Sequence, residues 1–219
     1  MTRDGEALAQ LFEDGAVLLA GDGSMEARGG AQIAELATAM WERGGPLRRA
    51  YYRVQWLVVP LAVVDVAAKA TQNPDYLLTL DDVRAFEAEH GPLPEGGWLL
   101  YRTGWDARAQ DEAAFLNADA TGPHTPGIDV ACARWLAAER PILGIGVETV
   151  GTDAGAAHSF DPPFPCHTFL LGAGKYGLTQ LANLDRLPTT GALLVAAPLK
   201  IVGGSGSPTR VLALVPRER

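Results

Sequence analysis

The stretch that decides the fold is WLVVPLAVVDV, residues 56–66. It is a nearly continuous run of apolar side chains, rich in valine, and it is short enough for a single strand. Such runs are typical of strands that are buried on both faces of a sheet covered by helices. Pro60 has no backbone N–H to donate, so we expect it near the start of this strand or at a bulge.

Segments with helical and strand patterns alternate on the C-terminal side of this run. Thr79 is expected to cap a helix that continues through Glu89 and is terminated by Gly91 and Pro92. Further helices are predicted at residues 112–117 and 128–138, a rigid loop at 121–127, and strands at 97–103, 141–147, 193–202 and 210–215. This alternation predicts an α/β fold in which helices cover a mixed or partly parallel sheet.

The N-terminal part of the chain has a different pattern. Residues 5–13 and 31–43 have the apolar spacing of helices, and residues 22–30 resemble a polar, glycine-rich loop. No internal repeat and no long linker divides the sequence. We therefore predict a single domain over residues 1–219.

Composition excludes several classes of function. The 219 residues are 47% hydrophobic and 20% charged, with a formal net charge of -8. No basic stripe indicates a nucleic-acid partner, and no apolar run reaches the roughly 18 residues of a membrane span. The N-terminus lacks a signal-peptide pattern, so we expect a cytoplasmic protein. Cys132 and Cys166 have no metal-type or disulfide spacing.

From about Val59 to Pro216 the chain resembles the cyclase family that includes bacterial kynurenine formamidases and isatin hydrolases. The resemblance is carried by segments in the family's order, among them NPDYLLTLDDVRAFEAEHG (73–91), GGWLLYRTGWDAR (96–108), FLNADATGPHTPG (115–127), GIGVETVGTDAG (144–155) and PPFPCHTFLLGAGKYG (162–177). It implies a swivelling β/β/α fold with a central barrel-like sheet and flanking helices. It also implies a small-molecule substrate and a homodimer or higher homo-oligomer.

The same resemblance shows where this chain departs from the family. Family members hold zinc or manganese with a His-x-Gly-Thr-His-x-Asp-x-Pro segment ahead of the first strand, and the ion activates water and polarises a carbonyl. Here the first histidine is His90. A further family ligand pair is a histidine and a glutamate twelve residues later; His167 matches the first, but Thr179 stands at the second. We therefore predict no metal and no cofactor.

In this comparison residues 1–55 form a shortened, divergent N-terminal region, and residues 56–219 form the family-like core. We treat it as open whether the N-terminal region fills the space of the lost metal site. The large side chains Met40, Trp41, Tyr51 and Tyr52 are the candidates for such filling.

Four residues are candidates for acid–base catalysis: His167, His124, Asp153 and Glu148. His167 has the family position of a site histidine, although a structural histidine that bridges loops would have the same surroundings. His124 lies between two prolines and either faces a pocket or makes a loop hydrogen bond. Asp153 would orient His167 or His124, or cap a turn, and Glu148 would act in the site or pair structurally.

Arg102, Thr103 and Trp105 leave the end of a predicted strand, which is a common place for ligand contacts. Arg102 would hold an anionic or carbonyl oxygen, and Trp105 would be a pocket wall or part of the core. We interpret His158 as a surface histidine and His90 as a helix C-terminal residue. The GAGKYG segment, residues 172–177, lacks the spacing of a phosphate loop and predicts a turn.

Three functions remain open from the sequence. The first is a metal-independent enzyme that closes, dehydrates or isomerises a carbonyl-rich, polyketide-like natural-product intermediate by general acid–base catalysis. The second is a metal-dependent hydrolase of amides or lactones, with a site rebuilt from His124, Asp153, His158 and His167. The third is a non-catalytic relative that acts as a binding partner of an active paralogue.

Overall fold

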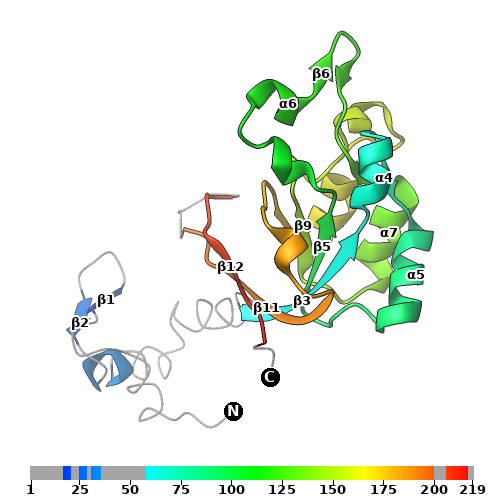
Figure 1. Ribbon diagram of the computed structural model, residues 1–219. Coiled ribbons are helices and arrows are strands. Elements are labelled where there is room, and N and C mark those ends of the chain that lie inside the picture. Colours follow the sequence, from blue (N-terminus) through cyan, green and yellow to red (C-terminus); the bar gives the residue numbers. More distant parts are fainter. Residues whose placement is uncertain (1–16, 21–24, 29–30, 36–57, 200–205, 217–219) are drawn as a thin grey trace. The chain divides into compact units, whose positions relative to one another are not determined.

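The computed structural model describes residues 17–20, 25–28, 31–35, 58–199 and 206–216 (Figure 1). The chain divides into two compact units, residues 1–55 and 56–219. This division falls at the boundary between the divergent region and the family-like core that the sequence indicates. The predicted helix at residues 5–13 and the side chains proposed to fill the metal space lie outside the described residues.

In the first unit, β1 (Val17–Ala20) and β2 (Met25–Arg28) form an antiparallel pair. The prediction of a loop over all of residues 22–30 was therefore wrong for residues 25–28. Strand pairing with an apolar segment upstream overrides the weak local preference of a short polar stretch, and local pattern does not report such pairing. Residues 31–35 are helical, as predicted, and Ile33 and Ala34 are buried.

The second unit is built on a six-stranded mixed sheet with the order β10-β9-β5-β3-β11-β12 (Figure 1). Its strands are β3 (Val58–Asp65), β5 (Trp98–Arg102), β9 (Gly144–Val147), β10 (Tyr176–Leu178), β11 (Thr190–Ala196) and β12 (Val211–Leu214). The first four strands of that order are parallel to one another, whereas β11 and β12 are antiparallel additions. The sheet is a curled half-barrel flanked by helices, which confirms the predicted α/β class (Figure 1).

Pro60 lies near the start of β3, as its missing N–H requires. The pairing of β3 with β11 shifts register between Thr190 and Leu193, next to Pro60. The expectation of a strand start or a bulge is confirmed in both respects, because Pro60 lies near the strand start and the bulge is in the neighbouring strand.

Helices α4 (Ala67–Gln72), α5 (Leu80–His90) and α7 (Val130–Glu139) lie on the same side of the sheet (Figure 1). Thr79 caps α5 as predicted: its hydroxyl accepts from the Asp82 N–H, and the Asp82 carboxylate accepts from the Thr79 N–H in return. The smaller elements are β4 (Leu77–Leu78), η1 (Trp105–Arg108), α6 (Glu112–Leu116), β6 (Ala118–Asp119), β7 (Gly122–Pro123), β8 (Gly127–Ile128), η2 (Gly155–Ser159), η3 (Cys166–Leu171) and η4 (Leu184–Arg186).

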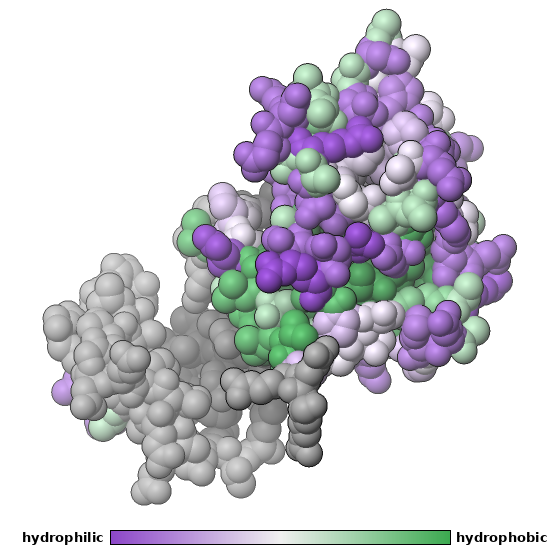
Figure 2. All heavy atoms as spheres, viewed as in Figure 1, coloured by the Kyte–Doolittle hydropathy of each residue, from purple (hydrophilic) through white to green (hydrophobic). Residues whose placement is uncertain are grey.

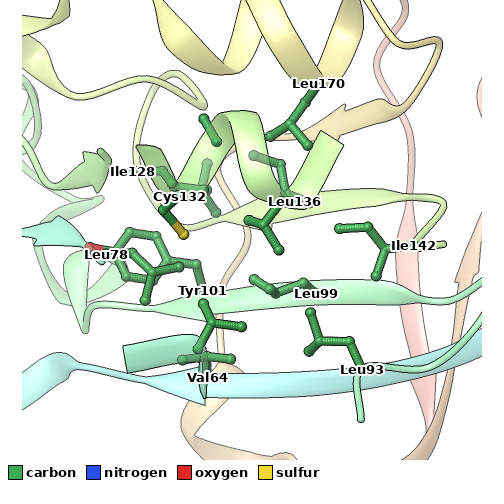
Figure 3. Packing of buried hydrophobic residues seen from close by; sticks show 14 of the residues in the cluster. Val64, Leu78, Leu93, Leu99, Tyr101, Ile128, Cys132, Leu136, Ile142 and Leu170 are labelled. Carbon is green, nitrogen blue, oxygen red and sulfur yellow. The ribbon is translucent and has the colours of Figure 1, made fainter. Parts of the chain in front are cut away.

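The core occupies both faces of the sheet. Along β5, Leu99 and Tyr101 pack in the cluster beneath α5 and α7, and Trp98 and Leu100 pack in a second cluster. Figure 3 shows Tyr101 and Leu99 of β5 beside Leu136 of α7. Burial on both faces explains why the strands read as continuous apolar runs rather than as alternating patterns.

One end of the sheet carries apolar side chains on its surface. Leu193 of β11 lies opposite Leu214 of β12, and both are exposed, as is Leu212. Figure 2 shows hydrophobic residues gathered over this part of the molecule. Among the described residues, no helix combines the length and apolar character needed to cross a membrane.

Candidate functional site

The carboxyl ends of β5 and β9 lie side by side, because Tyr101 pairs with Val147 in the parallel register. The residues at the ends of the two strands and just after them, Arg102 to Trp105 and Glu148, therefore meet at one edge of the sheet. In open α/β sheets, ligands bind outside this edge. Sequence reasoning placed these residues at strand ends correctly, and the register shows that the two ends are neighbours.

Glu148 is 1% exposed and locks the turn after β5. Its Oε2 accepts hydrogen bonds from the Thr103 N–H (2.7 Å), the Thr103 hydroxyl (2.9 Å), the Gly104 N–H (2.6 Å) and the Trp105 N–H (3.2 Å). Oε1 is buried and has no partner among the described residues. Burial raises the pKa of the Glu148 carboxyl group and outweighs the hydrogen bonds from Thr103, which lower it.

Asp153 and His167 form a dyad. Asp153 is buried; its Oδ1 accepts from the Cys166 N–H at 2.6 Å, and its Oδ2 accepts from the His167 N–H at 3.3 Å and contacts Nδ1 of the imidazole. The His167 side chain is 60% exposed. A carboxylate only accepts hydrogen bonds, so Nδ1 carries the proton and Nε2 of the neutral ring is an acceptor.

His167 is the second residue of the π-helical segment η3, which begins directly after Pro165. Short π-helical segments are rare and occur often at functional sites. The carboxylate of Asp153 binds two backbone N–H groups at the start of this segment and the imidazole as well. One buried acid therefore fixes both the backbone and the side chain of His167.

His124 has both ring nitrogens engaged. Nδ1 lies 2.8 Å from Asp75 Oδ2, and Nε2 lies 2.8 Å from the Thr121 hydroxyl and 3.3 Å from Asp119 Oδ1. The hydrogen bond to Asp75 raises the pKa of the His124 imidazole. The ring thus ties the β6–β7 hairpin to the segment before β4, and its catalytic role stays a prediction. Asp75 was not among the candidate site residues predicted from the sequence.

The residues proposed for substrate binding make most of their polar contacts with other residues of the protein. Arg102 forms an ion pair with Asp65, although its Nε has no partner among the described residues. Trp105 is 2% exposed, and its indole N–H donates to the Phe115 carbonyl at 2.8 Å. Thr103 binds Glu148. The structure therefore brings Thr103, Trp105 and Glu148 together, and separately pairs Asp153 with His167.

The described residues do not fit the metal ion that the family resemblance implies. Among them, no three side chains of His, Cys, Asp or Glu converge on a point where an ion could bind. The dyad supplies one imidazole and one carboxylate, whereas zinc sites need at least three protein ligands. Burial raises the pKa of the Cys132 and Cys166 thiols, which disfavours their thiolate forms.

Comparisons with known proteins agree with this fold. The model of the family described as "Putative cyclase" matches residues 22–154, which begins before the resemblance seen in the sequence. The chain is 52% identical over 164 residues to isatin hydrolase from Roseibium aggregatum, covering 75% of this chain and 62% of that protein. It is 31% identical over 161 residues to kynurenine formamidase from Salinibacter ruber, covering 71% and 62%.

A solved structure shows the same similarity in three dimensions. The crystal structure of an isatin hydrolase bound to the product analogue thioisatinate superposes with a TM-score of 0.73 and 52% identity. The match covers 75% of this chain and 62% of that one. The chain thus spans 62% of the length of the two curated relatives it matches.

Proposed function

This chain belongs to the cyclase family, and from that premise we propose that it hydrolyses an amide bond in a small aromatic molecule such as isatin. The names of both curated relatives denote hydrolysis of a C–N bond next to a carbonyl group. Neither curated relative's name refers to ring closure of a polyketide-like intermediate. Amide hydrolysis therefore replaces cyclisation as the favoured reaction.

The observation that carries the proposal is the Asp153–His167 dyad. Asp153 fixes the ring with the proton on Nδ1, which leaves Nε2 to accept a proton from water. The water oxygen attacks the amide carbonyl carbon and the C–N bond breaks. The proton taken up by Nε2 passes to the leaving nitrogen, so a carboxylic acid and an amine are formed and His167 returns to its neutral state; the acid then releases its proton to solvent as the carboxylate.

The surroundings of the two residues suit this role. The carboxylate side chain is 5% exposed, so it is held firmly, whereas the imidazole is 60% exposed and reachable. Acid–base catalysis by one positioned group contributes roughly 100- to 10,000-fold. We propose that Asp153 is a positioning residue and that His167 is the group that meets the reacting water.

The test is isatin hydrolysis by the purified chain, with product formation followed by liquid chromatography. We expect the His167→Ala and Asp153→Asn variants to lose roughly 100-fold or more in kcat, because the base or its tautomer is lost. Glu95→Gln, an acid-to-amide change at an exposed turn, is the matched control and should keep the wild-type rate. Unchanged rates in both dyad variants would refute the proposed base.

A non-catalytic role has its own signature. A chain that binds isatinate with a measurable Kd but gives no product above the uncatalysed rate would be a binding protein. The homo-oligomer expected from the family resemblance remains a proposal, and light scattering of the purified protein would measure its mass. Neither the binding result nor the measured mass would change the assignment of the fold.

A further inference from the structure

Phe164 exposes a large aromatic side chain close to the dyad. The residue is 47% exposed and lies three positions before His167. Exposing a phenylalanine ring forgoes the stabilisation that its burial would give. The sequence offered no signal for this residue beyond its place between prolines in PPFP, residues 162–165.

The backbone of Phe164 is in the left-handed region, with φ at 51°. Bulky residues other than glycine rarely adopt this conformation, because Cβ crowds the backbone. The conformation is fixed from both sides: the Phe164 N–H donates to the Ala157 carbonyl at 3.0 Å, and the Phe164 carbonyl accepts from the Thr168 N–H at 2.8 Å. Glycine or asparagine would fit this backbone with less strain.

The ring of Phe164 stands beside the imidazole of His167. Their centroids are 6.4 Å apart, and the planes are nearly perpendicular, at 79°. Aromatic rings stack or meet edge to face at centroid distances of about 4.5–7 Å. A planar ligand that contacts the Phe164 ring on the side of His167 would therefore also lie close to the imidazole.

A role in binding explains why an aromatic residue next to the candidate base is exposed and has an unfavourable backbone conformation. We propose that Phe164 selects aromatic substrates, with its ring as the platform on which the aryl ring of the amide packs beside His167. This inference rests on the proposed amide hydrolysis and extends it by naming a residue that selects for the aromatic ring of the substrate. Phe164 is in this view a specificity-determining residue and takes no part in proton transfer.

The first test compares α-keto acids that differ in whether they carry an aryl ring. Phenylglyoxylate and isatinate carry an aryl ring on an α-keto acid, whereas pyruvate carries a methyl group. By calorimetry we expect Phe164→Ala to weaken both aryl ligands roughly tenfold and to leave pyruvate unchanged. Phe164→Tyr keeps the ring and should bind like the wild type. Equal weakening of aryl and methyl ligands, or no weakening, would overturn the proposal.

The second test separates binding from folding. We expect Phe164→Gly to melt at a higher temperature than Phe164→Ala, because both lack the ring and only glycine accepts the positive φ without strain. Phe164→Ala should melt close to the wild type. Leu171→Ala is the matched control, because Leu171 is an exposed apolar residue seven positions after Phe164. This substitution should leave the affinities for all three ligands unchanged. A large drop in melting temperature for Phe164→Ala, with unchanged ligand affinities, would assign the ring to packing instead.

The two proposals fail separately. If the wild-type chain gives no product from isatin but Phe164→Ala selectively weakens the aryl ligands, hydrolysis is refuted and the aromatic platform stands. If the chain hydrolyses isatin and Phe164→Ala leaves KM and the aryl affinities unchanged, the platform is refuted and hydrolysis stands. With both correct, KM for isatin rises roughly tenfold in Phe164→Ala while kcat stays close to wild type.

Discussion

Glu148 shows how burial and hydrogen bonding compete at a single carboxyl group. One of its oxygens accepts three backbone N–H groups and a hydroxyl, an arrangement that favours the ionised form. The other oxygen is buried without a partner among the described residues, which favours the neutral form. The pKa of Glu148 is raised in the folded protein, so the effect of burial on this pKa exceeds the effect of the hydrogen bonds.

This direction predicts a pH dependence of stability. A carboxyl group whose pKa is higher in the folded state binds its proton more tightly there, so its stabilising contribution is complete below the ordinary value of 4.5. That contribution is lost as the pH rises through the folded-state pKa. The Glu148→Gln variant cannot titrate, so its melting temperature should improve relative to the wild type as the pH rises above about 4.5.

Thermal unfolding of both proteins between about pH 4 and pH 8 provides the measurement. Glu95→Gln serves as the control for removing an exposed carboxylate. If the difference in melting temperature between Glu148→Gln and the wild type does not vary with pH, Glu148 does not titrate abnormally.

At the scale of elements, two loops approach each other without room for side chains. A Cβ atom on Gly127 would lie 2.2 Å from the Ala154 backbone nitrogen. A Cβ atom on Gly155 would lie 2.2 Å from the Pro123 carbonyl oxygen. The loop that carries His124 therefore packs backbone to backbone against the loop that carries Asp153.

This contact predicts that a methyl group at Gly127 displaces the Asp153 loop. We expect Gly127→Ala to lower the free energy of unfolding by about 1–3 kcal/mol, as overpacking usually does. We also expect kcat for isatin to fall by about tenfold or more, because small displacements of a catalytic group are costly. Gly151→Ala, in the loop that carries Asp153, is the matched control, because the nearest atom to a Cβ there is 4.0 Å away. Equal effects of the two substitutions would contradict this account.

The elements that the sequence predicts well are those with local causes. The helix after Thr79 follows from its cap and its breakers, and the strand at residues 58–65 follows from its apolar run. The strand at residues 25–28 was missed because its partner, rather than its own composition, makes it a strand. Local signals therefore set which segments become helices and core strands, and pairing sets the rest.

The candidate site was predictable to the extent that its residue types and strand ends are visible in the sequence. Asp153 was expected to orient His167 or His124, and only the fold selects His167. The partner of His124 is Asp75, which lies 49 positions earlier. The left-handed backbone of Phe164 is imposed by hydrogen bonds from neighbouring turns. Contacts of this kind depend on tertiary placement, which has no local signature.

At the scale of the whole molecule, the fold of the family is retained in a chain whose described residues do not assemble the family's metal ligands. The match to an isatin hydrolase structure extends over 75% of the chain, and the two sequences are 52% identical. Within those described residues, Asp153 and His167 meet, but no group of three His, Cys, Asp or Glu side chains that could hold a metal ion forms around them. The dyad is therefore better suited to proton transfer than to holding an ion.

Because the described residues provide no metal site, we predict that the proposed hydrolysis does not depend on a divalent cation. After dialysis against EDTA, we expect the rate of isatin hydrolysis to stay at its starting value, and elemental analysis to show no stoichiometric zinc or manganese. The His167→Ala variant gives the reference for a site without its base. A rate that falls to that reference in EDTA and returns with added manganese would show that His167 serves as a ligand, with its other ligands drawn from beyond the described residues.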